Sequence, residues 1–405
     1  MTEQTEISVP WRGTTRRNVL LLAVCQSLSA TTMSLIITVH ALAGFMLAED
    51  KTLATLPLGI MFTMVMFSTI PASLFMKRYG RRLGFTLGQS IGTIAAIISV
   101  YAIFKEEFWL FALGGAFLGT HTAFWQYYRF AAADTASAAY RSRAISYVLA
   151  GGVISAILGP ELAKYSRELF APVVFAGNFV VMAILCLITI IVLQFVTIPP
   201  PSDEDRTSVG RPLSKIVSQP KFITAVLASM CGYGVMVLVM TTTPLAVLGN
   251  GHSFNDAAFI IQWHILGMFV PSFFTGHLIK RFGVLPIIVS GALLMAICVA
   301  VNMTGAGIAQ FWVALIALGV GWNFMFVGGT TMLTETYERS ERAKVQATND
   351  FLVFGTVAIA SLSSGVLFNT IGWQGVNLAV VAPIVLILTV TIWFRVAHAE
   401  TALAE

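Results

Sequence analysis

Charged residues are scarce in this chain of 405 amino acids. Asp, Glu, Lys and Arg make up 11% of the residues, hydrophobic residues make up 57%, and the mean hydropathy is +0.82. A soluble domain carries about 25% charged and about 45–50% apolar residues. The composition therefore excludes an ordinary soluble fold, because so few polar groups cannot cover a surface that faces water. It predicts an integral membrane protein.

Several signatures of other protein classes are also missing. There is no glycine-rich Walker sequence, so drive by ATP hydrolysis is not expected. The six histidines lack metal-ligand spacing, and no basic face is interleaved with aromatic residues, so the net charge of +5 does not indicate nucleic-acid binding. We expect no catalytic residues, no metal and no cofactor. Four single cysteines are expected to be small buried hydrophobes: Cys25, Cys186, Cys231 and Cys298.

Long apolar runs fill most of the chain. A helix needs about 20 apolar residues to cross a bilayer. The first run is too long for a cleavable signal sequence, so we expect it to remain as a span. Twelve runs meet the length requirement: 18–46, 53–76, 83–104, 108–130, 143–163, 170–197, 221–248, 257–279, 284–304, 308–333, 347–369 and 373–395.

Lysine and arginine predict the orientation of these spans. If the N-terminus is cytoplasmic and the spans alternate, twenty of the 24 Lys and Arg residues lie on the cytoplasmic side. Only Lys51, Lys105, Lys164 and Arg167 lie on the other side. We therefore expect both termini in the cytoplasm. The short loops are typical of a multi-pass protein of a bacterial inner (cytoplasmic) membrane.

One substantial linker divides the twelve spans into six and six. It begins with three prolines and continues with charges, over Pro199–Arg206, a composition typical of an exposed connection. The sequence predicts an all-α membrane protein with an N-terminal six-helix bundle over 1–198, a cytoplasmic linker over 199–220 and a C-terminal six-helix bundle over 221–405.

The two halves repeat each other at two places. Two cations, an aromatic residue and a glycine follow the second span as Lys77–Gly80 and the eighth as Lys280–Gly283, at an offset of 203. An acid stands seven residues before an arginine after the fourth span, Asp134–Arg141, and after the tenth, Glu335–Arg342, at an offset of 201. Two motifs at nearly one offset indicate an internal repeat, which is common in transporters.

This combination of a basic, glycine-bearing loop, its repeat and an acid-to-arginine stretch resembles the major facilitator superfamily over the whole chain. The resemblance implies two six-helix bundles related by an axis along the membrane normal, with a central cavity between them. Spans 1, 4, 7 and 10 are implied to line this cavity. Alternating access is implied to come from rocking one bundle on the other.

The loop motif departs from the family pattern Gly-x-Leu-x-Asp-Arg-x-Gly-Arg-Arg. Ser73 replaces its first glycine in the first half, and Lys77 and Lys280 replace the aspartate in both halves, whereas Gly276 is retained. We hypothesise that the two lysines form the cytoplasmic latch with other acids. The alternative is that they are ordinary loop lysines that obey the topology rule. The candidate acids are Asp134, Glu335 and Asp350.

Polar side chains within spans are costly in lipid and usually face protein or a wet cavity. In the first span, Ser27, Thr31, Ser34 and Thr38 form one helical stripe. The stripe fits a cavity wall, but it also fits close helix packing through small residues. Gln26 beside it is too large for such packing, which favours the cavity.

The fourth span presents His121, Trp125 and Tyr128 on one face at spacing i, i+4 and i+7. An aromatic face with a histidine suits an apolar, planar ligand that can stack. The alternative for Tyr127, Tyr128 and Arg129 is an interfacial belt near the end of the span.

These observations give two sets of candidate residues. The predicted substrate-binding residues are Gln26, Thr31, Ser34, His121, Trp125, Tyr128, Met236, Met240, Gln262, Trp322 and Asn323. The predicted coupling and gating residues are His40, Lys77, Arg78, Asp134, Glu161, His264, Lys280, Arg281, Glu335 and Asp350.

Coupling to protons requires a group that titrates in a buried site. Three histidines, His40, His121 and His264, and two acids, Glu161 and Asp350, meet this requirement by type. Asp350 fits three roles: a partner of the helix dipole, a latch or a proton carrier. Facilitated diffusion without coupling remains open.

Taken with the resemblance, the candidates favour a monomeric secondary transporter. Its partners are then a small amphipathic or aromatic organic solute, the lipid bilayer and protons. The direction of transport is open. Alternatives are a facilitated-diffusion carrier for uptake of a nutrient or vitamin, and a metal exporter. An integral-membrane enzyme or a receptor is a remote alternative.

Overall fold

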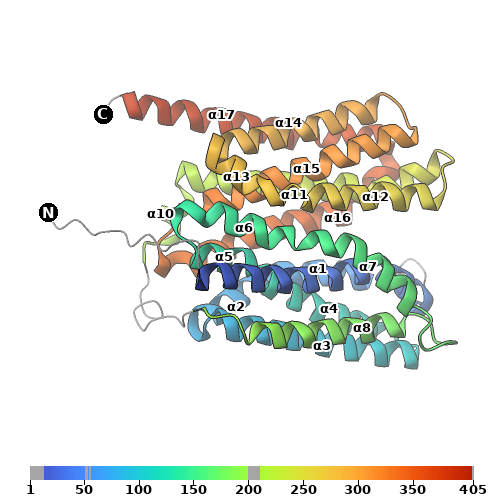
Figure 1. The fold of residues 1–405 in the computed structure, drawn as a ribbon. Helices are drawn as coiled ribbons and strands as arrows, with labels where there is room; N and C mark the ends of the chain where they lie inside the picture. Colours follow the sequence, from blue (N-terminus) through green and yellow to red (C-terminus); the bar gives the residue numbers. More distant parts are fainter. Residues whose placement is uncertain (1–12, 51–52, 54–55, 199–209, 404–405) are drawn as a thin grey trace.

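The computed structural model describes residues 13–50, 53, 56–198 and 210–403, and its described secondary structure is helical apart from one isolated bridge between Phe170 and Val173. In Figure 1 the helices lie roughly parallel in two groups, with α1 to α8 in the lower half and α11 to α17 in the upper half. We call these groups the N half and the C half. The proline-rich part of the predicted linker, 199–209, lies outside the described residues.

The N half holds the first six predicted spans in order. Its helices are α1 (Thr14–Leu47), α2 (Leu56–Tyr79), α3 (Arg81–Lys105), α4 (Phe108–Trp125), α5 (Tyr128–Thr135), the 3₁₀ turn η2 (Ala138–Tyr140), α6 (Arg141–Ala150), α7 (Gly152–Ser166) and α8 (Ala176–Leu193).

The C half repeats this order. Its helices are α11 (Pro220–Gly249), α12 (Phe254–Phe269), α13 (Ser272–Phe282), α14 (Val284–Met303), α15 (Ile308–Leu333), the 3₁₀ turn η3 (Arg339–Glu341), α16 (Arg342–Ala379) and α17 (Val381–Leu403). A short helix, α10 (Leu213–Val217), precedes α11 and occupies part of the predicted linker.

Ten described helices are long and apolar enough to cross a membrane, or eleven if the bent pair α12 and α13 counts as one span. The remaining predicted span, 108–130, corresponds to α4 and α5, which are separated at Gln126 and Tyr127. The eleventh and twelfth predicted spans meet at Gly372, whose φ of 66° breaks the helical path. The all-helical membrane fold predicted from the composition is confirmed.

The bend between α12 and α13 is 41° and falls at Val270 and Pro271. Proline has no backbone N–H to continue the helical ladder, so a bend at this point has an identifiable cause. Asn323 of α15 braces the bend. Its amide donates hydrogen bonds to the Met268 carbonyl oxygen at 2.7 Å and to Ser272 Oγ at 2.5 Å.

Glycines let helices of one half approach each other closely. A Cβ added to Gly291 of α14 would lie 2.8 Å from the carbonyl oxygen of Gly321 in α15, and the converse distance is also 2.8 Å. In lipid, helix association depends on such close packing because no hydrophobic driving force acts between helices. The glycines therefore hold together the framework that carries the interface between the halves.

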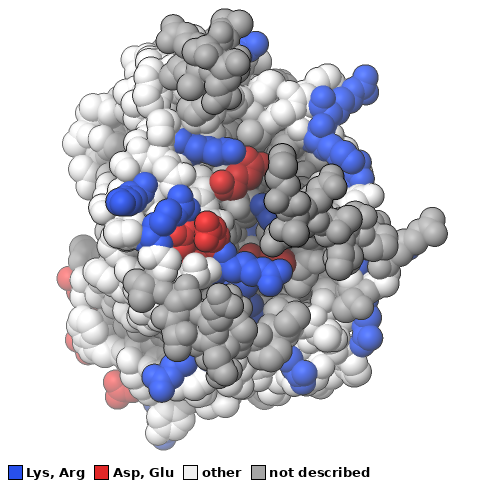
Figure 2. Space-filling model, turned by 90° about the vertical axis from the view of Figure 1, so that its left-hand side faces the viewer, with Lys and Arg blue, Asp and Glu red and all other residues white. Residues whose placement is uncertain are grey.

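The beginning of α1 and the end of α17 lie at the same end of the bundle in Figure 1. Figure 2 views that end and shows Lys and Arg side chains spread around a centre where acidic side chains also lie. The basic ends of α2 (Lys77, Arg78) and α13 (Lys280, Arg281) belong to it. We call this end the terminal face.

Candidate functional site: the interface between the halves

The two halves pack together along α2 and α16 and between α7 and α12, and near the terminal face they also form two hydrogen-bonded contacts. In the first, α2, α3 and α5 of the N half approach α16. In the second, α6 approaches α13 and the end of α15. Six hydrogen bonds between the halves lie in these two contacts.

The first contact contains a fully buried ion pair. Arg129 Nη2 of α5 lies 2.6 Å from Asp350 Oδ1 of α16, and the two side chains are 1% and 0% exposed. The guanidinium carbon of Arg129 also lies 4.4 Å and 4.8 Å from the ring centroids of Phe130 and Phe326. Asn349 donates a hydrogen bond to Asp350 Oδ1 at 2.8 Å. Such a pair is strongly destabilised when one partner is removed, because a lone buried charge is left behind.

A second charged cluster surrounds Arg81, which lies at the start of α3. Its Nη2 lies 2.8 Å from Asp134 Oδ2 and donates to Gln346 Oε1 of α16 at 2.6 Å. Arg342 of α16 also approaches Asp134, at 3.7 Å. Gln346 in turn donates a hydrogen bond to the Tyr337 hydroxyl at 2.6 Å. Charges from both halves thus meet at one acid, Asp134.

Two serine hydrogen bonds reveal the internal repeat at this interface. Ser73 Oγ of α2 donates to the Ala343 carbonyl oxygen of α16 at 2.7 Å. Ser142 Oγ of α6 donates to the Gly276 carbonyl oxygen of α13 at 3.2 Å. The offset of 203 takes Ser73 to Gly276, and the offset of 201 takes Ser142 to Ala343. The two bonds therefore join equivalent positions, with the serine on opposite partners.

The second contact is made by close packing and by hydrogen bonds to backbone carbonyl oxygens and between side chains. A Cβ on Gly276 would lie 2.8 Å from the Arg143 Cα and 2.8 Å from the Ser142 carbonyl oxygen, so only glycine fits without backbone movement. The Tyr147 hydroxyl lies 3.3 Å from His277 Nε2. Arg141 donates to the Thr334 carbonyl oxygen at 3.3 Å.

An aromatic cluster of the C half borders the buried ion pair. Tyr233 of α11 lies 5.3 Å, 5.4 Å and 5.8 Å, between ring centroids, from Trp322, Phe326 and Phe354. Trp322 and Phe326 are stacked at 5.0 Å and 15°. The Phe326 ring also faces Arg129, so this one residue contacts both the aromatic cluster and the ion pair.

This cluster also reaches the N half. Phe269 of α12 lies 5.9 Å from Trp322 and packs against Gly152 of α7, where an added Cβ would lie 2.6 Å from the Phe269 ring. The indole Nε1 of Trp322 is buried without a hydrogen-bond partner among the described residues. We call Tyr233, Phe269, Trp322 and Phe326 the aromatic cluster.

The predicted residues of the first span pack within the N half. Ser27 Oγ donates to the Gly151 carbonyl oxygen at 2.6 Å, and Ser34 lies where a Cβ on Gly159 would fall, 2.4 Å from its Oγ. These contacts are those of the packing interpretation. Thr31 and Gln26 are buried at 2% and 4% exposure.

The predicted face of the fourth span is turned toward α3. His121 Nδ1 lies 3.0 Å from the Gly88 carbonyl oxygen, and the Tyr128 hydroxyl accepts a hydrogen bond from Gln89 at 2.9 Å. Trp125 is buried, with no partner for its Nε1 among the described residues. His121 and Tyr128 thus contact the interior of the N half in this conformation, and their role toward a substrate stays a prediction.

The predicted residues of the C half are spread over several surroundings. Trp322 belongs to the aromatic cluster, whereas Asn323 braces the α12–α13 bend. Met236 is buried, Met240 is half-buried and Gln262 is exposed. Only Trp322 among these five borders the ion pair through its stacked neighbour.

The predicted coupling residues divide in the same way. Asp134 and Asp350 lie at the first contact, and Glu335 pairs with Lys221 at 2.5 Å. Lys280 lies 5.5 Å from the ring centroid of Tyr140, so this lysine does join the halves, through an aromatic ring. Arg78 and Arg281 are exposed at the terminal face.

Three other coupling candidates lie away from both contacts. His40 is buried and stacks on Phe111 at 4.6 Å, and His264 Nδ1 lies 2.8 Å from the Leu315 carbonyl oxygen. Glu161 of α7 is exposed. No group of three or more His, Cys, Asp or Glu side chains in the described part of the chain is arranged to hold a metal ion.

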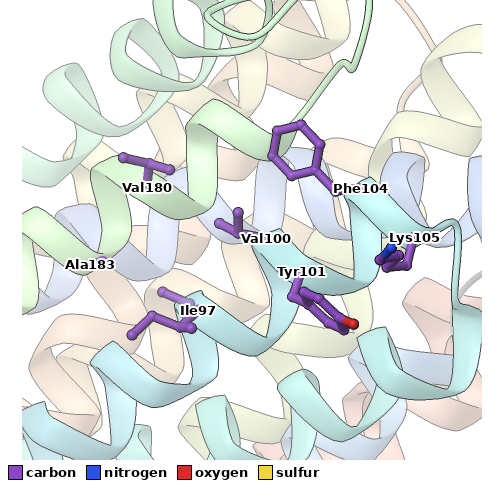
Figure 3. A pocket seen from close by; sticks show the side chains of 8 residues that line it. Ile97, Val100, Tyr101, Phe104, Lys105, Val180 and Ala183 are labelled. Atoms are coloured by element: carbon purple, nitrogen blue, oxygen red, sulfur yellow. The ribbon is translucent and has the colours of Figure 1, made fainter.

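A groove on the outside of the N half lies between α3 and α8 (Figure 3). Its volume is about 540 Å³, and its lining is apolar apart from Lys105 and the Tyr101 hydroxyl. Ile97 and Tyr101 in this lining are more than half exposed. The groove contains none of the predicted site residues and lies apart from the interface between the halves.

The linker is tied to the terminal face by one ion pair. Arg211, just before α10, lies 2.6 Å from Glu341 Oε2 of η3 and also donates its backbone N–H to Glu341 Oε1 at 2.7 Å. The hydrogen bond from the Arg211 side chain lowers the pKa of Glu341 to about 2. Glu341 is therefore ionised at neutral pH, and its ion pair with Arg211 attaches the segment before α10 to η3.

The predictions from the sequence missed three residues of the charged contact. Arg81 and Gln346 were not among the gating candidates, and Arg129 was considered only as part of an interfacial belt. The break at Gln126 and Tyr127 changes the direction of Arg129 relative to α4. The signal for Gln346 was present, since Gln346, Asn349 and Asp350 are three polar residues within the first turns of an apolar span.

Comparison with known proteins identifies relatives of the whole chain. The family model described as Major Facilitator Superfamily matches residues 19–262 and 247–404. A riboflavin transporter, RfnT, of Brucella anthropi is 41% identical over 383 residues, which are 94% of this chain and 96% of that protein. An uncharacterized MFS-type transporter, YdeG, of Bacillus subtilis is 25% identical, with coverage of 94% and 92%.

Solved structures with similar folds span nearly the whole chain as well. The human organic anion transporter MFSD10 (TETRAN) matches with a TM-score of 0.77 at 13% identity, covering 94% of this chain and 100% of that one. The E. coli fucose:proton symporter FucP matches with a TM-score of 0.72 at 15% identity, with coverage of 95% and 99%. These likenesses concern the fold.

Proposed function

The chain belongs to the major facilitator superfamily, a family of transporters and not of enzymes, and from this premise we propose that it carries riboflavin across the membrane. The proposal places the riboflavin site at the aromatic cluster, between the halves and beside the Arg129–Asp350 pair. It narrows the amphipathic or aromatic solute expected from the sequence to one vitamin. The 41% identity to a riboflavin transporter over almost the full length supports it.

The observation that carries the proposal is the position of the aromatic cluster. Riboflavin has a flat three-ring isoalloxazine with two carbonyl groups, joined to a chain that bears hydroxyl groups. Flat rings bind well against aromatic side chains, which prefer offset-stacked or edge-to-face contacts. The buried Trp322 Nε1 has a hydrogen to donate and no described partner, so it suits a ring carbonyl oxygen.

The cluster also lies where alternating access requires the site. Tyr233, Trp322 and Phe326 belong to the C half, whereas Phe269 packs on Gly152 of the N half. A ligand at this place contacts both halves, so rocking of one half on the other changes the side from which it is reached. We propose a monomeric carrier with both termini in the cytoplasm of a bacterial inner membrane, in line with the basic terminal face.

Binding can be tested with purified protein, because stacking on aromatic side chains quenches flavin fluorescence. We expect saturable quenching of riboflavin by the wild-type protein. In Trp322→Leu we expect affinity to fall by roughly tenfold or more, the scale of losing one stacked aromatic contact and its hydrogen bond. The control is Trp109→Leu, because Trp109 is 65% exposed at the start of α4 and does not belong to the aromatic cluster.

Transport is tested by riboflavin entry into liposomes that contain the protein. Counterflow of labelled riboflavin against unlabelled riboflavin inside needs no driving gradient. Absence of both quenching and counterflow in the wild-type protein would exclude riboflavin as the substrate. Binding without counterflow would instead indicate a receptor.

We further propose that transport is coupled to protons. An imposed pH gradient should then drive riboflavin above its equilibrium distribution, and flux that ignores the gradient would leave facilitated diffusion as the mechanism. Riboflavin itself is uncharged near neutral pH, so a membrane potential alone exerts no force on the solute. Any gradient-driven accumulation would therefore be due to an ion carried with it.

A further inference from the structure

The Arg129–Asp350 pair joins the two halves, and both of its side chains are shielded from water. Arg129 comes from α5, Asp350 comes from α16, and the side chains are 1% and 0% exposed. Opening the terminal face requires α5 and α16 to move apart, so the pair has to break once in each transport cycle. This inference rests on the proposed alternating-access function.

Asp350 has an incomplete set of partners. Its Oδ1 atom accepts from both Arg129 and Asn349, at 2.6 Å and 2.8 Å. Its Oδ2 atom is buried and has no hydrogen-bond partner among the described residues. A carboxylate oxygen without a donor is the place where a proton can bind without displacing an existing hydrogen bond.

The other charged and titratable groups that face Asp350 come from three helices and a turn. Arg81 of α3 and Tyr233 of α11 lie near enough to act on it through space, as does Tyr127 between α4 and α5. The Tyr127 hydroxyl donates to the Thr69 carbonyl oxygen at 3.0 Å. Arg81 is held by Asp134 and Gln346. Arg129 is thus the one described cation in direct contact with Asp350.

Arg129 keeps other partners when the pair breaks. Its Nη1 donates to the Gln126 carbonyl oxygen at 2.6 Å and to Gln126 Oε1 at 3.1 Å, and Phe130 covers its face. All of these groups belong to the N half. Asp350 would retain only Asn349 of its contacts. The free-energy cost of separation therefore falls mainly on the carboxylate, because a buried charge without its counter-charge is strongly disfavoured.

We propose that Asp350 is the proton-coupling residue and that proton binding to its carboxylate releases the contact between α5 and α16. The proton arrives at Oδ2, Asp350 becomes neutral, and the bond to Arg129 loses its ionic character. The terminal face then opens, water reaches the carboxyl group, and the proton leaves on that side. The ionised carboxylate pairs again with Arg129 and closes the face, so one proton crosses for each cycle.

The main test compares two kinds of riboflavin flux in liposomes. In the wild-type protein, a gradient of one pH unit should support accumulation on the order of tenfold at one proton per riboflavin. Asp350→Asn mimics the protonated carboxyl group in size and charge. We expect it to retain counterflow but to lose accumulation, so that the inside-to-outside ratio falls to about one. Accumulation that survives in Asp350→Asn would overturn the proposal.

The matched control is Asp134→Asn, which changes the other acid at the same contact. Asp134 is 16% exposed and has two cations nearby, Arg81 and Arg342. We expect this variant to transport at an altered rate but still to accumulate riboflavin in response to the pH gradient. Loss of accumulation in both variants, with counterflow intact, would mean that coupling belongs to the charged contact as a whole and not to Asp350.

A second readout is independent of the substrate. Spin labels on Arg78→Cys and Arg281→Cys report the distance between exposed positions of α2 and α13 at the terminal face. Lowering the pH should lengthen this distance in the wild-type background, whereas in Asp350→Asn the short and long distances should be populated in a ratio that does not change with pH. If riboflavin is the wrong substrate, flux fails but this pH response remains. A pH response that is unchanged in Asp350→Asn would contradict the proposal.

Discussion

The two contacts between the halves occupy equivalent places in the repeat, but they use different chemistry. The contact of α2, α3 and α5 with α16 contains the Arg129–Asp350 pair and the Arg81–Asp134 cluster. The contact of α6 with α13 contains a backbone approach at Gly276 and the hydrogen bond from Ser142. One contact is controlled by charge and the other by shape.

The repeat itself shows how this difference arises. The offset of 203 carries Arg81 to Val284, and the offset of 201 carries Asp350 back to Leu149 and Arg129 forward to Thr330. Only the Asp134 position keeps its acid in the other half, as Glu335. Charges can respond to protons, whereas close packing cannot. On the proposal above, protonation of Asp350 releases the first contact, while the close packing at Gly276 in the second contact stays unchanged.

The largest effect should come from breaking the charged contact at its buried pair. Arg129→Met leaves Asp350 without its cation, and removing one partner of such a pair costs about 3–5 kcal/mol. We expect a lower melting temperature of the protein in detergent. The double variant Arg129→Met/Asp350→Leu should recover much of the loss, since an apolar pair of similar size often replaces a buried ion pair without cost. An equally unstable double variant would show that the charges themselves hold the helices.

The shape-controlled contact should be broken next most strongly by a single methyl group. Gly276→Ala places a Cβ 2.8 Å from the backbone of α6, and overpacking of this kind costs about 1–3 kcal/mol. We expect slower riboflavin counterflow and a longer distance between labels on α2 and α13. Gly365→Ala in α16 is the matched control, because nothing lies within 4 Å of an added Cβ there. Equal behaviour of the two variants would refute the close approach of α6 and α13.

The two serine bonds should contribute less, and about equally. Ser73→Ala and Ser142→Ala each remove one hydrogen bond between the halves, a contribution of about 0.5–1.5 kcal/mol. Because the bonds occupy repeat-equivalent positions, we expect similar changes in the label distance at the terminal face. A large effect of one variant with no effect of the other would show that the two contacts do not contribute equally to closing the terminal face.

The smallest effect should come from the linker, outside both contacts. The pKa of Glu341 is about 2, below its usual value of 4.5, because Arg211 stabilises the ionised form. This stabilisation is fully present above about pH 4.5 and is lost as the pH falls toward 2. A fluorescent probe on Lys215→Cys of α10 should therefore gain mobility in that range. In Glu341→Gln the probe should already be mobile at neutral pH, with counterflow little changed.

The sequence was sufficient to predict the fold and much less informative about the site. Long apolar runs and the Lys and Arg bias depend on local composition, so they predicted helical spans and their order. The face that a side chain presents depends on helix direction, which the breaks after Trp125 and Phe269 alter. His121 and Tyr128, which share one predicted face, both contact α3, and which neighbouring helix a face meets cannot be deduced from spacing alone.

Contacts between the halves were harder still to predict, because their hydrogen bonds join residues 130 or more positions apart. Asp134 and Asp350 were recognised as acids in unusual places, but their partners Arg81 and Arg129 were not. The family pattern directed attention to Lys77 and Lys280, whose role as a latch stays a prediction. A departure from a family motif indicates that a contact has changed, but it does not say which residue has replaced it.

The hydrogen bonds of Ser73 and Ser142 show how the two halves of a duplicated protein diverge. An ancestral repeat with identical halves would place the same donor on both sides of its axis, giving two donors where one suffices at each contact. In this chain the N half supplies both donors, Ser73 and Ser142, and the C half supplies both acceptors, so each contact keeps one bond. The halves are thus complementary more than they are copies: a chain of two N halves would carry two serines at each contact, and a chain of two C halves would carry none.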